Sequence, residues 1–455
     1  MDYTSISPDQ RQEMLDAIGV DSIDRLFDVI DPEIRFEGAL NLPPAMSELE
    51  LQREASRLSL RNRGTDTLTC FAGAGAYDHF IPAFIDQMIS RGEFLTAYTP
   101  YQGEASQGSL QAFFEFQTQI ARLTGLDIAN ASLYEGASST SEGVLMAINT
   151  TDRSRVLVAG TLHPDYRQVL KTVLTDLPIE IIEIQPNSSG TIDPAEVQRH
   201  ADDNTACLVL PSPNVYGLIE DWQACFKALK QKAGEQAVAI AVFNPIACGL
   251  LRSPGACGAD IATGEGQPLG IPLNFGGPYL GLFSAKSSFL RKMPGRLVGQ
   301  TTDAEGRRAF CLSLQTREQH IRGAKATSNV CTNQGLLALR ATMYMSAMGP
   351  HALREAASQC WHKAHYLANA ISALPGYSLK YQGEFFNEFV VSCPAPTASI
   401  LKHCKSRGLL AGVPLSSARL GSIGSENELL IAVTEKRSRS DMDALAHALS
   451  EAASA

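Results

Sequence analysis

The residues best suited to chemistry lie in one short polar loop, Ala97-Tyr-Thr-Pro-Tyr-Gln-Gly-Glu-Ala-Ser-Gln-Gly, ahead of a stretch with helical periodicity. Loops on a rigid scaffold commonly carry binding groups, and two tyrosines this close favour a recognition role over an ordinary exposed loop. The candidate recognition residues are Tyr98, Thr99, Tyr101, Gln102, Glu104, Ser106 and Gln107.

A run of small residues, Glu135-Gly-Ala-Ser-Ser-Thr-Ser-Glu-Gly, precedes a second helical stretch. Small residues let a ligand approach the backbone, and a helix N-terminus attracts anions, so this run could form a phosphate cup around Gly136. Considered alone, the run is better interpreted as an ordinary helix start capped by Ser139 or Thr140.

Two other motifs are weaker. The glycine-rich run Phe71-Ala-Gly-Ala-Gly-Ala-Tyr-Asp has Asp78 where a dinucleotide-binding fingerprint needs its third glycine, so it predicts a tight turn. Cys360, His362 and His365 are close in sequence but lack a second ligand cluster. We therefore predict an exposed helical face there and no metal site.

The bulk composition is that of an ordinary globular chain of 455 residues, with a net charge of -10 that weighs against nucleic-acid or anionic-membrane binding. The N-terminus has no basic segment followed by an apolar one, and no apolar run approaches the ~18 residues of a membrane span. Ten scattered cysteines predict reduced thiols and a cytoplasmic location.

Alternating apolar and amphipathic segments predict an α/β fold with a large, mostly parallel sheet covered by helices. Ligand sites in such sheets lie at the carboxyl ends of the strands. The expected organisation is an N-terminal helical arm (1–66), a large domain (67–345) and a smaller C-terminal α/β domain (346–455). The longest expected helix covers roughly Leu353 to Leu374 and ends at Pro375-Gly376.

The stretch from Tyr98 to Ser132 closely resembles the glycine cleavage system P-protein family. Further segments agree with that family in order along nearly the whole chain, and they begin at Phe71, His163, Gly258, Met293 and Leu314. The resemblance implies a fold-type-I transferase architecture that uses pyridoxal phosphate. It also implies decarboxylation of glycine and transfer of its aminomethyl group to the lipoyl group of H-protein.

Two positions assign the chain to the non-catalytic half of the two-subunit form of this family. Catalytic halves carry Asn-Leu-His-Lys, whose lysine holds the cofactor covalently, and here Gln267 stands at the lysine position. An amide nitrogen is not a nucleophilic amine. Asn244 stands where these enzymes carry an aspartate that pairs with the pyridine nitrogen. We therefore expect no catalytic residue and no covalent cofactor in this chain alone.

The resemblance implies a homologous beta subunit that binds pyridoxal phosphate, an alpha-two beta-two assembly, and a partner site completed by the loop Tyr98–Gln107. Second-line candidates for anion or interface contacts are Arg317, His320, Lys325 and Asn329, with a structural hydrogen-bonded loop as the alternative. The chain departs from the family pattern at Gly323-Ala324, which replace an Arg-Glu pair.

Two rival hypotheses remain. One is a self-sufficient pyridoxal-phosphate enzyme that uses another lysine, such as Lys286, Lys292 or Lys325. The other is a cofactor-free scaffold that only stabilises the beta subunit.

Overall fold

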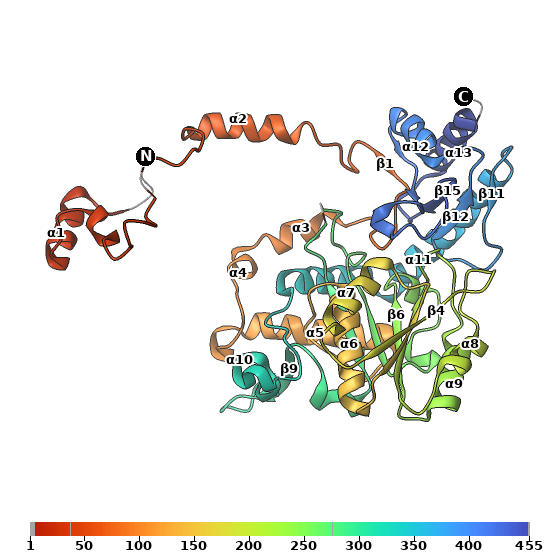
Figure 1. Cartoon of the computed structure of the whole chain (residues 1–455), viewed down its shortest axis with the longest axis horizontal. Helices are drawn as coiled ribbons and strands as arrows, with labels where there is room; N and C mark the ends of the chain where they lie inside the picture. Colours follow the sequence, from red (N-terminus) through yellow and green to blue (C-terminus); the bar gives the residue numbers. More distant parts are fainter. Residues whose placement is uncertain (1–4, 37, 275, 454–455) are drawn as a thin grey trace. The chain divides into compact units, whose positions relative to one another are not determined.

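The computed structural model describes residues 5–36, 38–274 and 276–453, and the chain divides into the units Met1–Arg63 and Gly64–Ala455 (Figure 1). The first unit contains helices α1 (Pro8–Ile18) and α2 (Glu48–Ser59). Each begins with a capping box, in which a serine and a Gln or Glu three residues later bond to each other's backbone. The first helix ends at a glycine, Gly19, in the left-handed conformation.

The second unit is built on a seven-stranded sheet with the order β2-β8-β7-β6-β5-β3-β4. The strands β3 to β7 pair in parallel, whereas β8 is antiparallel to both of its neighbours. The predicted mostly parallel sheet is therefore confirmed, although the apolar run that forms β8 carried no sign of the reversed direction. The strands span Ile128–Ala129 (β2), Arg155–Ala159 (β3), Glu180–Ile184 (β4), Thr205–Ser212 (β5), Val238–Phe243 (β6), Ile261–Glu265 (β7) and Gly281–Ala285 (β8).

Helices cover both faces of this sheet because its central strands are apolar on both sides. In β3, Val156 and Val158 join a core with α6 and α7, while Leu157 and Ala159 join a core with α5, α9 and α11 on the other face. The helices span Gln107–Thr124 (α5), Gly136–Thr151 (α6), Pro164–Leu174 (α7), Pro194–His200 (α8), Trp222–Ala233 (α9) and Gly335–Ser372 (α11).

The C-terminal part adds a four-stranded antiparallel sheet with its own apolar core against the second half of α11. Its order is β11-β12-β15-β14, and a separate short pair, β1 with β13, is parallel. The elements span Thr69–Cys70 (β1), Ser378–Leu379 (β11), Glu388–Ser392 (β12), Leu409–Leu410 (β13), Val413–Pro414 (β14), Glu428–Ala432 (β15), Thr397–Ser406 (α12) and Arg439–Ala453 (α13).

The long helix α11 begins at Gly335, well before the predicted start near Leu353, and it bends where Gly349 adopts a φ of 60° ahead of Pro350. The predicted domain boundary at residues 345/346 falls inside this helix. Since residues 64–455 form one compact unit, the division into a large and a small domain stays a prediction.

The remaining elements are short. A hairpin of β9 (Leu297–Thr302) and β10 (Arg308–Ser313) packs on α5. The short helices α3 (Ala83–Ile89) and α4 (Gly92–Leu95) lead into the polar loop, and α10 covers Gln319–Arg322. Within the described ranges, no helix combines the length and apolar character needed to span a membrane.

Candidate functional site

A crevice lies at the carboxyl ends of β5, β6 and β7, the edge where parallel sheets bind ligands. Its walls come from the turns after these strands, from α7 and from the segment 74–77. It encloses about 90 Å³, well below the ~300 Å³ at which small-molecule pockets begin. The side chains that close it explain this small volume.

Gln267, which we predict to stand at the lysine position of catalytic halves, is almost fully buried. Its Nε2 donates to the backbone oxygens of Tyr77 (3.0 Å) and Ile271 (2.7 Å), and its Oε1 accepts from the backbone nitrogen of Tyr77 (2.8 Å). Both ends of the amide are therefore used to join two loops, which is a structural role.

The side chain of Asn244 bonds to the backbone of the turn that follows it. Its Oδ1 accepts from the backbone nitrogens of Ile246 (2.9 Å) and Ala247 (3.3 Å), so the side chain begins the short helical turn after β6. A neutral amide in this role would not hold a pyridinium proton.

The N-terminus of α6 is already bound by two carboxylates of the chain itself. Glu135 accepts from the backbone nitrogens of Ala137 and Ser138, and Glu265 Oε2 accepts from that of Gly136 (3.0 Å). The predicted cap by Ser139 or Thr140 is therefore wrong, because Thr140 bonds back to the Gly136 carbonyl and Glu135 is the cap. The amides that would cradle a phosphate have internal partners.

The rival lysines lie elsewhere. Lys286 Nζ bonds Asp260, which precedes β7 and so lies at the opposite end of that strand from the crevice. Lys292 Nζ bonds the carbonyl of Asn149, near the end of α6 and about 20 Å along that helix from Gly136. No lysine is found among the described residues that line the crevice. The residues at this position therefore do not fit pyridoxal phosphate.

A second buried carboxyl closes the crevice from the C-terminal sheet. Glu388 on β12 accepts from the Tyr77 hydroxyl (2.7 Å) and from the backbone nitrogen of Ala74 (2.6 Å). Burial raises the pKa of Glu388 to about 7, and burial raises the pKa of Glu265 to about 7 as well.

These two carboxyls predict how stability depends on pH. A carboxyl with a pKa of about 7 in the folded chain and 4.5 in the unfolded chain contributes most below pH 4.5 and loses that contribution as the pH rises to 7, at about 1.4 kcal/mol per pH unit. In urea unfolding at a series of pH values, we expect Glu388→Gln to flatten the decline between pH 5 and 7. An unchanged slope would mean that Glu388 is ionised in the folded chain.

The polar loop lies outside this crevice, whose lining includes none of its residues. Tyr98 is 86 % exposed and Tyr101 52 % exposed, and Gln102 and Glu104 are also exposed. Thr99 and Ser106 are half-buried, and Ser106 makes no side-chain cap for α5. The two tyrosines of the loop are therefore accessible at the surface.

Gln107 differs from the other loop residues because it anchors the loop. Its amide nitrogen donates to the carbonyls of Gly103 and Phe310 (both 2.8 Å), and its oxygen accepts from the backbone nitrogen of Phe310 (2.8 Å). This bridge to β10 occupies the whole side-chain amide, so Gln107 holds the loop in place.

Arg296 connects the loop to the segment before α11. This buried guanidinium donates to Thr332 Oγ1 and Asn333 Oδ1 (both 3.1 Å), to the Cys331 carbonyl (3.0 Å) and to the Tyr101 hydroxyl (3.4 Å). It is a functional candidate that the sequence interpretation missed, although it lies inside the family-like segment that begins at Met293.

The second-line candidates separate into two groups. The ring of His320 packs edge-on against Tyr101 at 5.4 Å, next to the loop, whereas Arg317 is buried and donates to the backbone oxygens of Met293 and Gly295. Arg317 therefore matches the structural alternative. Lys325, Asn329 and the Gly323-Ala324 departure are exposed.

Comparison with known proteins decides the family. The family model described as "Glycine cleavage system P-protein" matches residues 1–449. The chain belongs to the glycine cleavage system P-protein family. Two curated members are named "Probable glycine dehydrogenase (decarboxylating) subunit 1". The one from Thermomicrobium roseum is 47% identical over 453 residues, covering 99% of this chain and 100% of the relative. The one from Prosthecochloris aestuarii is 48% identical over 443 residues, covering 97% and 98%.

Solved structures agree with this P-protein assignment. A crystal structure of glycine decarboxylase (P-protein) of the glycine cleavage system, in inhibitor-bound form, is 40% identical with a TM-score of 0.91, covering 99% of this chain and 100% of that one. A NifS-like protein, 12% identical with a TM-score of 0.63 over 84% of this chain and 98% of its own, shares the fold alone. The expected fold-type-I architecture is confirmed.

Proposed function

We propose that this P-protein chain is the subunit of glycine decarboxylase that does not anchor the cofactor, and that it acts with a homologous beta subunit. The supporting observation is the contrast between its two candidate sites. Its own cofactor position is filled by Gln267, Glu265 and Glu135, whereas its polar loop presents exposed tyrosines outward. The naming of close relatives as subunit 1 of glycine dehydrogenase (decarboxylating) supports the same role.

In the complete enzyme, glycine loses its carboxylate as carbon dioxide and its aminomethyl group passes to the lipoyl group of H-protein. Pyridoxal phosphate, bound by the beta subunit, supplies the electron sink for this reaction. The chain described here contributes no covalent step. Its part is to complete the partner's pocket and to limit the access of water to it.

Tyr98 and Tyr101 are the residues proposed to do this. Both are exposed. The Tyr101 hydroxyl accepts from the Arg296 guanidinium, and its ring packs against the ring of His320. An aromatic wall with two hydroxyl donors suits a small zwitterionic substrate, because the rings exclude water while the hydroxyls can bond a carboxylate. His320 adds a polar group beside the same surface.

The assembly that follows is an alpha-two beta-two complex that receives lipoylated H-protein in the cytoplasm. This proposal rests on the resemblance to the family and on a loop that lies outside the chain's own crevice. The cofactor-free scaffold remains the alternative, and it differs from our proposal only in giving the loop no role in the reaction.

Substitution of the loop tyrosines separates these two hypotheses. We expect Tyr98→Phe and Tyr101→Phe to slow glycine decarboxylation in the reconstituted complex by up to tenfold each, the effect of one lost hydrogen bond of roughly 1.4 kcal/mol. Tyr366→Phe is a matched control, because its hydroxyl bonds Asp443 in the C-terminal part. Normal assembly with unchanged decarboxylation in both loop variants would support the scaffold instead.

A further inference from the structure

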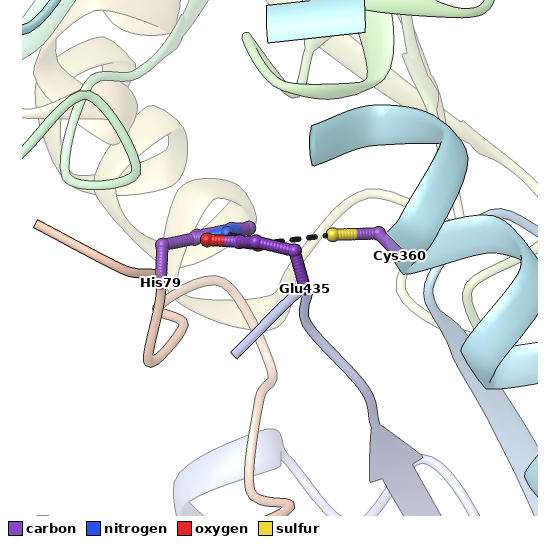
Figure 2. A group of neighbouring side chains, drawn as sticks. All are labelled: His79, Cys360 and Glu435. Carbon is purple, nitrogen blue, oxygen red and sulfur yellow. Dashed lines mark hydrogen bonds and ion pairs between the residues drawn. The ribbon is translucent and has the colours of Figure 1, made fainter. Parts of the chain in front are cut away.

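Three side chains from distant parts of the chain meet in a buried cluster. His79 follows the segment 74–77 that lines the crevice, Cys360 lies in the second half of α11, and Glu435 follows β15 (Figure 2). His79 and Cys360 are buried, and the side chain of Glu435 is 11 % exposed. The chain must bring together residues 79, 360 and 435 to form this cluster.

One carboxylate oxygen is the centre of the group. Glu435 Oε2 lies 2.7 Å from His79 Nδ1 and 3.3 Å from Cys360 Sγ, and Figure 2 shows these three side chains converging. The other oxygen, Oε1, accepts from the backbone nitrogen of Phe80 (2.7 Å), which fixes the orientation of the carboxylate. The ligand atoms of the three residues all lie within 4.8 Å of one another.

Two buried polar atoms at or near the cluster make no hydrogen bond within the described residues. His79 Nε2 and the Tyr344 hydroxyl are buried, and neither has a hydrogen-bond partner among the described residues. Tyr344 is close enough to Glu435 and Cys360 to interact electrostatically with both. Buried polar atoms without partners are uncommon, and the Tyr344 hydroxyl therefore indicates that something further belongs beside Glu435 and Cys360.

We propose that His79, Cys360 and Glu435 bind a divalent transition-metal ion of the zinc type. Imidazole, thiolate and carboxylate are the three ligand classes of zinc sites, and a thiolate with an imidazole disfavours calcium and magnesium. The metal takes the place of the hydrogens that Oε2 now accepts. Bonds form from the metal to Cys360 Sγ, His79 Nδ1 and Glu435 Oε2. The thiol proton is released to solvent, and the proton on His79 Nδ1 also leaves while the neutral ring carries its proton on Nε2.

Two of the three ligand separations suit this exchange, and the third is within 4.8 Å. Tetrahedral zinc separates a nitrogen from an oxygen ligand by about 3.3 Å and a sulfur from an oxygen ligand by about 3.5 Å. His79 and Glu435 would have to move apart by well under 1 Å from their present 2.7 Å, while Cys360 and Glu435 are almost in place. Three protein ligands leave a fourth position for water.

The sequence neighbours of Cys360 take no part. The ring of His365 stacks on Phe385 at 4.0 Å and its Nδ1 lies 2.8 Å from the Trp361 carbonyl, while His362 packs against Trp361. Reading the metal ligands from their spacing along the helix would therefore select the wrong histidines. The metal instead joins the segment after Tyr77, helix α11 and the segment after β15.

Metal titration of the purified full-length chain, freed of metal with a chelator, tests this proposal. We expect one Zn²⁺ or Co²⁺ per chain, a higher Tm with zinc, and a sulfur-to-cobalt charge-transfer band in the Co²⁺ form. Cys360→Ser and Glu435→Gln should each weaken binding at least tenfold, whereas Cys331→Ser, at an exposed cysteine, should bind normally.

The unmodified chain alone can overturn the proposal, so the test does not depend on the variants folding. The proposal is wrong if the folded chain takes up no Co²⁺, or takes it up without a thiolate band. It is also wrong if a band persists in Cys360→Ser but disappears in Cys331→Ser, because the metal would then be held by an adventitious surface thiol.

Discussion

Replacing Gln267 by lysine is expected to destabilise the chain by about 3 kcal/mol and to leave it unable to hold pyridoxal phosphate. A lysine has no acceptor, so the backbone nitrogen of Tyr77 would lose the oxygen that now lies 2.8 Å away. The new ammonium would be buried where a neutral amide stands. The cofactor's phosphate would meet Glu135 and Glu265 at the helix N-terminus that it needs.

Urea unfolding measures the first effect, and borohydride reduction followed by mass spectrometry of the chain incubated with pyridoxal phosphate measures the second. Gln168→Lys is the matched control, because it places the same side chain at an exposed position of α7. A cofactor adduct trapped on the lysine introduced by Gln267→Lys would contradict our account of the filled cup. A stoichiometric adduct on one lysine of the unmodified chain, together with an aldimine absorption band before reduction, would support the self-sufficient enzyme instead.

Arg296→Lys should reduce glycine decarboxylation in the reconstituted complex by more than tenfold while the chain still folds. The guanidinium spans four acceptors on two segments, and a lysine ammonium is a single point that cannot reach all of them. The buried acceptors left without donors should cost about 2 kcal/mol of stability. Tyr101 would lose the group that holds it, and the loop before α5 would loosen.

Hydrogen exchange of residues 98–107 and 328–334 should show this loosening directly. Arg308→Lys provides the matched control, because Arg308 is exposed on β10 and its guanidinium lies over the Phe310 ring. If Arg296→Lys slowed decarboxylation with no change in exchange, Arg296 would act in some other way than by positioning the loop. If Arg296→Lys changed neither decarboxylation nor hydrogen exchange, Arg296 would not be needed to hold the loop.

The architecture was largely predictable because it depends on local patterns. The fully buried strands β5 and β6 read as unbroken apolar runs, and the edge strand β4 reads as an alternation. The direction of β8 was not predictable, since an apolar run has no sign of orientation. The early start of α11 was missed because Gly349 and Pro350 look like a helix end although the chain only bends there.

Single positions of the candidate site could be singled out from the sequence, but the long-range contacts between its residues could not. Gln267 and Asn244 are singled out by comparing motifs, and their assignment to the lysine and aspartate positions stays a prediction. Glu265 reaching the α6 N-terminus and Glu388 reaching Tyr77 join residues 129 and 311 positions apart. No short motif encodes such a contact, so the filling of the cup is visible only in the fold.

The carboxylates at the start of α6 also bear on whether the stability of the fold depends on a bound cofactor. An enzyme whose native state alone binds a cofactor gains stability from that cofactor by mass action, and it loses this gain when the cofactor becomes scarce. Here the corresponding groups are Glu135, Glu265 and Gln267, which are joined to the chain by covalent bonds. Their local concentration does not vary with cellular supply. Under the proposed function, the stability of this subunit does not depend on the supply of pyridoxal phosphate, although the reaction of the complex does.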